Sequence, residues 1–244
     1  MSDVATVMLL RPKSAGFEVF LMPGPPTGAI APNEDARVAA ARVLFSACGV
    51  LLAHDVGQIE TLELPNLFLL RKKIRAGGDA TEVLRAAGLG WSTETVLPWS
   101  HWLTPSIEQE RTSQRIFVAE VPPGMLPTFD KDEQVEATWV RPGDVMNVEP
   151  AILRTCWELA QHARIADVFA AARMRAEEPQ SILPRLHRSQ RCLLLPWDPD
   201  YERAGQGESA PFEHLPKWAT GPSRFVLEGR TWKHVAAPGS TTAG

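Results

Sequence analysis

The chain has 244 residues, and its 25 lysines and arginines against 29 aspartates and glutamates give a formal net charge of −4. This length is enough to bury a substantial core, and 44% hydrophobic and 22% charged residues are ordinary values for a globular protein. Nucleic acids and anionic membrane surfaces favour basic partners, so we expect neither as a partner here.

The three cysteines, Cys48, Cys156 and Cys192, are odd in number, widely separated and in no metal-ligand spacing. We therefore expect reduced thiols and a cytoplasmic location. Residues 1–10 lack a basic start and contain too short an apolar run for a signal peptide or a membrane span.

The first predicted elements are two strands, residues 5–10 and 17–22, joined by a turn that contains Gly16. Residues 23–32 are too rich in proline and glycine for a helix. Residues 33–47 are predicted to be helical, with Asn33 as the N-cap and Gly49 at the C-terminal end. The predicted core-facing residues of this helix are Val38, Ala41, Leu44 and Phe45.

A second helical stretch is predicted over residues 67–87, with a break at Gly77 and Gly78. Further strands are predicted at residues 97–103, 116–121 and 137–140. Residues 152–176 form the longest predicted helical segment, with an apolar stripe of Leu153, Trp157, Ala160 and Phe169. Mixed strands and helices in this order predict an α/β fold.

Residues 179–244 form a proline-rich extension to a predicted domain of residues 1–178. Short apolar runs cut by prolines, at 182–186 and 192–201, precede a hairpin at 224–232 with Glu228 and Gly229 in its turn. The extension can bury little by itself, so it should pack on the domain or on a second subunit, which leaves a homodimer open. Asp198 and Asp200 are interpreted as turn residues in preference to a cation site. Residues 238–244 are predicted to be a disordered tail.

Six residues, Gly28, Glu34, Arg42, Leu44, Gly49 and Val50, follow the spacing G-x5-E-x7-R-E-U-x-E-E-x-G-U, in which U is a bulky aliphatic residue. This pattern resembles the signature of the Nudix hydrolases. Residues 97–105, 111–119 and 133–142, with Trp139, resemble the branch related to coenzyme A and acyl-CoA diphosphatases. The resemblance covers about residues 1–175 and implies a Nudix α/β/α sandwich with a mixed sheet, here with a helical insertion and a C-terminal extension.

The three signature glutamates of the Nudix box are replaced by Val43, Ser46 and Ala47. In the family these positions lie on one helix face and hold divalent cations against a diphosphate. Magnesium prefers hard oxygen ligands, and none of these side chains is a carboxylate, so we expect no metal site and no cofactor in the box. The family's glycine-rich loop is also reduced to residues 26–30, with one glycine where the family has two.

The remaining candidates have two interpretations each. Glu34 either complements the start of the helix or keeps a metal- or phosphate-side role. The resemblance implies that Arg42 braces the catalytic loop, beside Gly28 on the substrate side. Glu133 and Glu136 lie where many Nudix enzymes carry a general base, although a solvated acidic loop is the simpler interpretation.

Arg111 and Arg115 are candidates for binding phosphate, or they belong to an exposed polar strand face. His101, between Trp99 and Trp102, is interpreted as a packed or hydrogen-bonded residue. Cys48 is interpreted as a small core residue.

Two functions follow from the resemblance and its departures. In the first, the chain is a degenerate Nudix protein that binds a small diphosphate-containing ligand, of nucleotide or coenzyme A type, without hydrolysing it, or that acts as a regulatory or structural subunit. In the second, it is a diphosphatase whose Mg²⁺ or Mn²⁺ ions are held by a rearranged set of carboxylates. That set would come from Glu34, Asp35, Glu133 and Glu136.

Overall fold

The structure is a computed structural model, and it describes residues 1–22, 24–55, 64–105, 108–130, 132–177, 179–187, 191–204, 212, 214–235 and 237. No helix in these ranges is long and apolar enough to cross a membrane.

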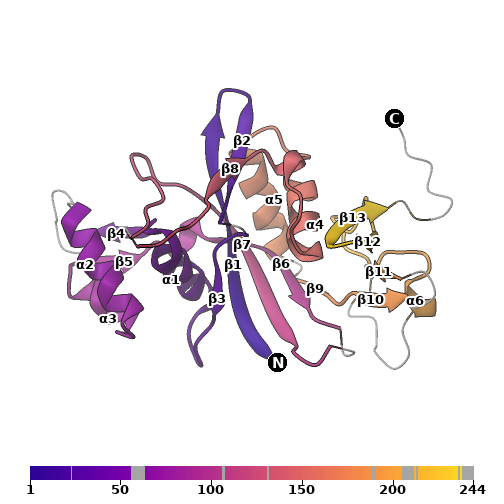
Figure 1. The fold of residues 1–244 in the computed structure, drawn as a ribbon, viewed down its shortest axis with the longest axis horizontal. Coiled ribbons are helices and arrows are strands. Elements are labelled where there is room, and N and C mark those ends of the chain that lie inside the picture. The colour runs from indigo at the N-terminus through magenta and orange to yellow at the C-terminus, as the bar shows by residue number, and fades with distance from the viewer. Residues whose placement is uncertain are drawn as a thin grey trace.

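The main sheet has seven strands in the order β8-β2-β1-β7-β6-β9, with β3 also paired to β1 (Figure 1). The pairs β1/β7 and β6/β9 are parallel and the others are antiparallel, so the sheet is mixed. The strands are β1 Ser2–Lys13, β2 Gly16–Leu21, β3 Thr27–Ala29, β6 Leu97–Leu103, β7 Thr112–Glu120, β8 Thr138–Val140 and β9 Ser181–Ile182. The predicted first hairpin and the three later strands are confirmed.

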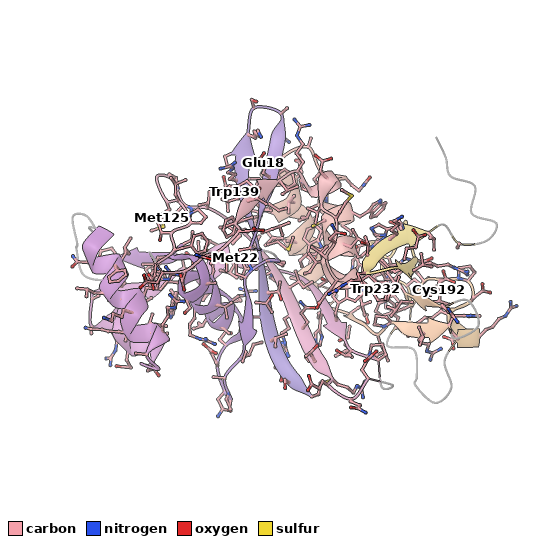
Figure 2. All side chains as sticks on the ribbon, viewed as in Figure 1. Glu18, Met22, Met125, Trp139, Cys192 and Trp232 are labelled. Carbon is pink, nitrogen blue, oxygen red and sulfur yellow. The ribbon has the colours of Figure 1, made fainter. Side chains whose placement is uncertain are left out.

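Helices cover both faces of the sheet, and β1 has apolar side chains on both of its sides. Val7 and Leu9 join the hydrophobic cluster under α1 (Ala36–Cys48), whereas Met8 and Leu10 join the cluster under α4 (Pro150–Leu159) and α5 (Ile165–Glu177). A strand buried on both faces has a nearly continuous hydrophobic run, as β1 has. Figure 1 shows α1 on one side of the sheet and α4 and α5 on the other, an α/β/α arrangement. Met22, Met125 and Trp139, labelled in Figure 2, border the cluster under α1.

The helical insertion follows α1 and consists of α2 (Leu64–Arg75) and α3 (Ala80–Arg85). The two helices are separated at Gly77, whose φ of 91° lies in the left-handed region that favours glycine. They lie between β4 (Ala53–Asp55) and β5 (Leu89–Trp91), which form a separate two-stranded sheet. The predicted helical stretch and its break are confirmed. Two short 3-10 helices, Thr93–Thr95 and Pro142–Asp144, complete the domain.

The predicted long helix at residues 152–176 is wrong, because the structure has two helices separated by residues 160–164. Leu159 and Ile165 are both buried in the cluster under α4 and α5. They are six residues apart, which in one continuous helix would place them about 120° apart around the axis. The break lets both side chains reach the same core.

The extension begins with β9, at the edge of the main sheet, and continues as a separate four-stranded antiparallel sheet. Its elements are β10 Arg185–His187, β11 Cys192–Leu194, α6 Tyr201–Ala204, β12 Arg224–Glu228 and β13 Thr231–Val235. The predicted hairpin is confirmed, with Gly229 at φ 64° in its turn. Cys192 and Trp232 mark this sheet in Figure 2. The predicted disordered tail, residues 238–244, lies outside the described residues.

Arg154 of α4 is buried and forms hydrogen bonds between the domain and the extension. Its guanidinium pairs with Glu158 and donates hydrogen bonds to the carbonyls of Thr220 (2.6 Å) and Pro222 (2.9 Å). In the extension, Arg224 pairs with Asp198 and Asp200, and the Asp200 N–H donates to Asp198. The two aspartates therefore hold a turn, as interpreted from the sequence.

Candidate functional site

The α1 helix begins at Ala36, three residues later than predicted. Its N-cap is Asp35, whose carboxylate accepts hydrogen bonds from the backbone N–H groups of Arg37 (2.8 Å) and Val38 (3.2 Å). Asn33, the predicted N-cap, lies in the preceding loop with φ 63°, a conformation that asparagine tolerates better than most residues. Gly49 ends the helix as predicted, in the left-handed conformation.

The core-facing side of α1 largely matches the prediction. Ala41, Leu44 and Phe45 are buried, although Val38 is only half-buried. Cys48 is buried too, and burial raises the pKa of its thiol to about 11. Its interpretation as a core residue is confirmed.

The three box positions that carry glutamates in the family have no carboxylates in this chain. Val43 is 5% exposed and packs against Gly28 of β3, while Ser46 and Ala47 are half-buried. Nowhere in the described ranges do three or more histidine, cysteine, aspartate or glutamate side chains gather as metal ligands would. The donors present at the box therefore do not fit a divalent cation that needs hard oxygen ligands.

Glu34 and Arg42 form a two-pronged ion pair across the loop before α1. The Arg42 Nε and Nη2 atoms donate to the two Glu34 oxygens at 2.7 and 2.8 Å, and Nη2 also donates to the Ala29 carbonyl at 2.7 Å. The Ala31 N–H donates to Glu34 at 2.9 Å. Burial alone would raise the pKa of Glu34, but the hydrogen bonds from Arg42 and Ala31 outweigh it and hold this pKa below 4.5. Glu34 thus braces the loop with Arg42 and leaves helix capping to Asp35.

Arg71 of α2 places a cation at the C-terminal end of the box helix. Its guanidinium donates to the carbonyls of Ser46 (3.1 Å) and Ala47 (2.8 Å), and to the Thr128 carbonyl (2.9 Å). Arg71 is only 4% exposed. Carbonyls in the last turn of a helix lack partners within the helix and carry the negative end of its dipole, so a guanidinium is a favourable neighbour there.

The acidic loop at residues 130–136 faces the same arginine. Asp130 and Glu133 lie 3.8 and 3.6 Å from Arg71, and both pair with Arg75. The hydrogen bond from Arg75, followed by that from the Asp130 N–H, holds the pKa of Glu133 below its usual value. Glu136 is exposed and has no ion pair with a described residue. The two glutamates that the sequence suggested as general bases are therefore in different environments.

The two candidate phosphate-binding arginines do not converge. Arg111 precedes β7, and its Nε donates to the Thr104 carbonyl at 3.0 Å. Arg115 is an exposed residue of β7, four positions further on, or about 13 Å along an extended strand. Its guanidinium has no hydrogen bond or ion pair with the described residues.

Arg115 borders a cleft of about 310 Å³ at the edge of the main sheet, here called the sheet-edge cleft. The N-terminal turn of α1, strands β6 and β7, the end of α5 and the extension surround it. The side chains that line it include those of Arg37, His101, Arg115, Phe117, Arg175 and Trp218.

His101 is a fixed part of the cleft wall. Its ring nitrogens lie 2.9 Å from Ser113 Oγ and 2.7 Å from Ser181 Oγ, so it links β6 to β7 and β9. Burial, with a smaller effect from Arg115, lowers the pKa of His101. The interpretation of His101 as a hydrogen-bonded residue is confirmed.

Sequence reasoning missed Arg71 and Trp218. Arg71 lies on the buried side of α2 with Leu70 and Ile74, so an arginine on an apolar helix face was the available signal. Trp218 has no local signal, because its contacts with Arg175 and Trp197 come from residues distant in the sequence.

No family model and no curated relative matches the sequence. Among solved structures, a Nudix hydrolase from Alicyclobacillus acidocaldarius is similar with a TM-score of 0.56 and 17% identity, over 70% of this chain and 96% of that one. An Ap4A hydrolase of C. elegans gives a TM-score of 0.36 and 13% identity, over 72% of this chain and 96% of that one. A Nudix hydrolase from M. smegmatis gives 0.34 and 14%, over 69% and 86%.

The chain therefore has the α/β fold of the Nudix hydrolases, as the sequence predicted.

Proposed function

We propose that this chain is a Nudix-fold protein that binds a small diphosphate-containing ligand, of nucleotide or coenzyme A type, without hydrolysing it. The observation that carries the proposal is the chemistry of the box. Val43 is packed against Gly28, and Ser46 and Ala47 offer no carboxylate. Without these carboxylates nothing offsets the cost of removing water from a divalent cation.

Arg71 supports the same proposal. A guanidinium already bound to the carbonyls of Ser46 and Ala47 places positive charge beside the box positions. Two like charges repel more strongly in a partly buried site than in water, so Arg71 opposes the entry of a metal ion there.

The alternative, a diphosphatase with rearranged carboxylates, has three of its four ligands already engaged in other contacts. Glu34 is held by Arg42, Asp35 caps α1, and Glu133 is held by Arg75. Glu136 is exposed. A metal site built from these residues would first have to break ion pairs and a helix cap.

The test combines binding and turnover on one sample. ADP and coenzyme A are titrated calorimetrically into the protein, with Mg²⁺, with Mn²⁺ and with chelator, and the recovered ligand is then analysed by chromatography. We expect binding of at least one ligand in all three buffers and intact ligand at the end. Metal-dependent hydrolysis that is lost in Glu34→Gln or Glu133→Gln would instead establish the rearranged diphosphatase.

A further inference from the structure

We propose that the sheet-edge cleft is a ligand site separate from the metal-binding positions of the Nudix box, and that it binds a phosphate ester of a flat aromatic compound. The phosphate lies between Arg37 and Arg115, and the ring lies against Trp218. This inference goes beyond the proposed function and rests on it only for the statement that the bound ester stays intact.

Charge is the first argument. Three arginines, Arg37, Arg115 and Arg175, line the cleft against one carboxylate, that of Asp35, in a chain with a net charge of −4. The Asp35 carboxylate accepts the N–H groups of Arg37 and Val38 and keeps its negative charge, but the three arginines outnumber it. A local excess of positive charge in a concave site attracts anions.

Two of these arginines are available for a ligand. Neither Arg37 nor Arg115 has a side-chain hydrogen bond or ion pair with the described residues. They come from different elements, the first turn of α1 and the middle of β7, so they approach the cleft from two walls. Guanidinium groups bind phosphate oxygens with paired, charge-assisted hydrogen bonds, and the positive end of the α1 dipole adds to the attraction.

Arg175 is already paired with Glu158, so it positions an aromatic side chain and does not bind the phosphate. Its guanidinium lies 2.9 Å from Glu158, 4.1 Å from the centre of the Trp99 ring and 4.9 Å from that of Trp218. Arg175 thereby fixes Trp218, which the extension contributes to the cleft. A positioned indole offers a flat apolar surface on which an aromatic ring stacks.

The size and walls of the cleft define the ligand further. Its volume of about 310 Å³ is at the lower end of the range for small-molecule sites, which favours a compact ligand. Pro98, Phe117 and Pro179 add apolar surface beside the arginines. Trp218 and Pro179 belong to the extension, so the extension completes the site.

The cleft is separate from the three positions of the box that carry glutamates in the family. Arg37 is in the first turn of α1, whereas Val43, Ser46 and Ala47 follow it by six, nine and ten positions, about 9 to 15 Å along the axis. A phosphate held by Arg37 does not reach the positions at which the family binds metal.

The experiment measures the binding of AMP by calorimetry to the full chain and to three variants. Arg37→Gln and Arg115→Gln remove one guanidinium each and break no described contact, so both should fold. Arg173→Gln changes an exposed arginine of α5 that does not line the cleft and is the matched control. We expect each cleft variant to bind AMP about tenfold or more weakly, and the control to bind it like the wild type.

Two further ligands separate the phosphate from the ring. Inorganic phosphate and adenosine should each bind more weakly than AMP, and Trp218→Leu should weaken AMP and adenosine but not inorganic phosphate. Wild-type affinity in Arg115→Gln and Arg37→Gln, or no AMP binding by the wild type, would overturn the cleft proposal. Metal-dependent hydrolysis of ADP by a protein that still binds AMP through Arg115 would overturn only the proposed function.

Discussion

Val43 packs so closely against Gly28 that a β-carbon built on the glycine would lie 2.9 Å from the Val43 Cγ2 atom. The family's first box glutamate would stand at this valine. At this position the structure has an apolar contact between α1 and β3, where the signature that the sequence resembles has a carboxylate.

The first prediction concerns the restoration of the box. The triple variant Val43→Glu, Ser46→Glu and Ala47→Glu should be less stable than the wild type without metal, because like charges on one helix face repel and position 43 is buried. Mg²⁺ or Mn²⁺ should restore part of the melting temperature, since a ligand that binds only the folded state stabilises it. We expect little turnover of ADP or coenzyme A, because the loop at residues 26–30 also departs from the family.

Thermal unfolding with and without metal measures this effect. The control is the same triple substitution to glutamine, which matches glutamate in size and carries no charge. If neither Mg²⁺ nor Mn²⁺ changes the melting temperature of the glutamate variant, the box has changed in geometry as well as in charge.

The second prediction concerns Arg71. Arg71→Met should lower the free energy of unfolding by roughly 1–3 kcal/mol, because the carbonyls of Ser46 and Ala47 lose their donor. Arg75→Met, which removes a partly exposed guanidinium from the same acidic loop, should cost at most about 1 kcal/mol. Urea denaturation of the two variants compares them, and equal losses would show that Arg71 adds nothing beyond a surface ion pair.

The third prediction concerns acid stability. The pKa of Glu34 in the folded protein is below 4.5, its ordinary value, so the stability from this group is complete above about pH 4.5. It is lost as the pH falls through the lowered folded pKa. Glu34→Gln should therefore unfold more easily than the wild type at neutral pH, and the difference should shrink below pH 4.5.

Glu94→Gln is the control for this experiment, because Glu94 is exposed and has no ion pair with a described residue. Denaturation at a series of pH values should show no such convergence for the control. A constant gap between Glu34→Gln and the wild type down to strong acid would argue against the ion pair with Arg42.

Local signals predicted most of the fold. The first hairpin, the box helix and the break at Gly77 each depend on residues within one turn or two strands, where periodicity, glycine and apolar runs decide the structure. The N-cap of α1 was harder, since Asn33 and Asp35 are both suitable cap residues. The ion pair between Arg42 and Glu34 holds Glu34 in the preceding loop. Asp35 is then the residue at the start of the helix and accepts the hydrogen bonds of the cap.

Contacts between distant residues limited the prediction of the site. Arg71 is 24 residues from Ala47 and 57 from Thr128, and Trp218 reaches Arg175 from the extension. No spacing within one element predicts such pairs. From the sequence, Arg111 and Arg115 were either phosphate-binding residues or an exposed strand face, and the phosphate role stays a prediction. The structure places Arg115 and Arg37 at the same cleft.

The last prediction tests the contact between the extension and α4. Gly221 has φ 76°, and a β-carbon there would lie 2.1 Å from the Trp157 Cη2 atom. Gly229, in the β12–β13 turn, has φ 64° but no heavy atom within 4 Å of its built β-carbon. Both Gly→Ala variants carry the cost of a left-handed alanine, about 1–2 kcal/mol. Only Gly221→Ala must also displace the Trp157 ring, which adds roughly 1–3 kcal/mol of overpacking.

We expect Gly221→Ala to have the lower melting temperature of the two, and Gly229→Ala to report the backbone cost alone. Equal melting temperatures would mean that Trp157 yields freely and that the extension is held to α4 mainly by the hydrogen bonds of Arg154 to the carbonyls of Thr220 and Pro222.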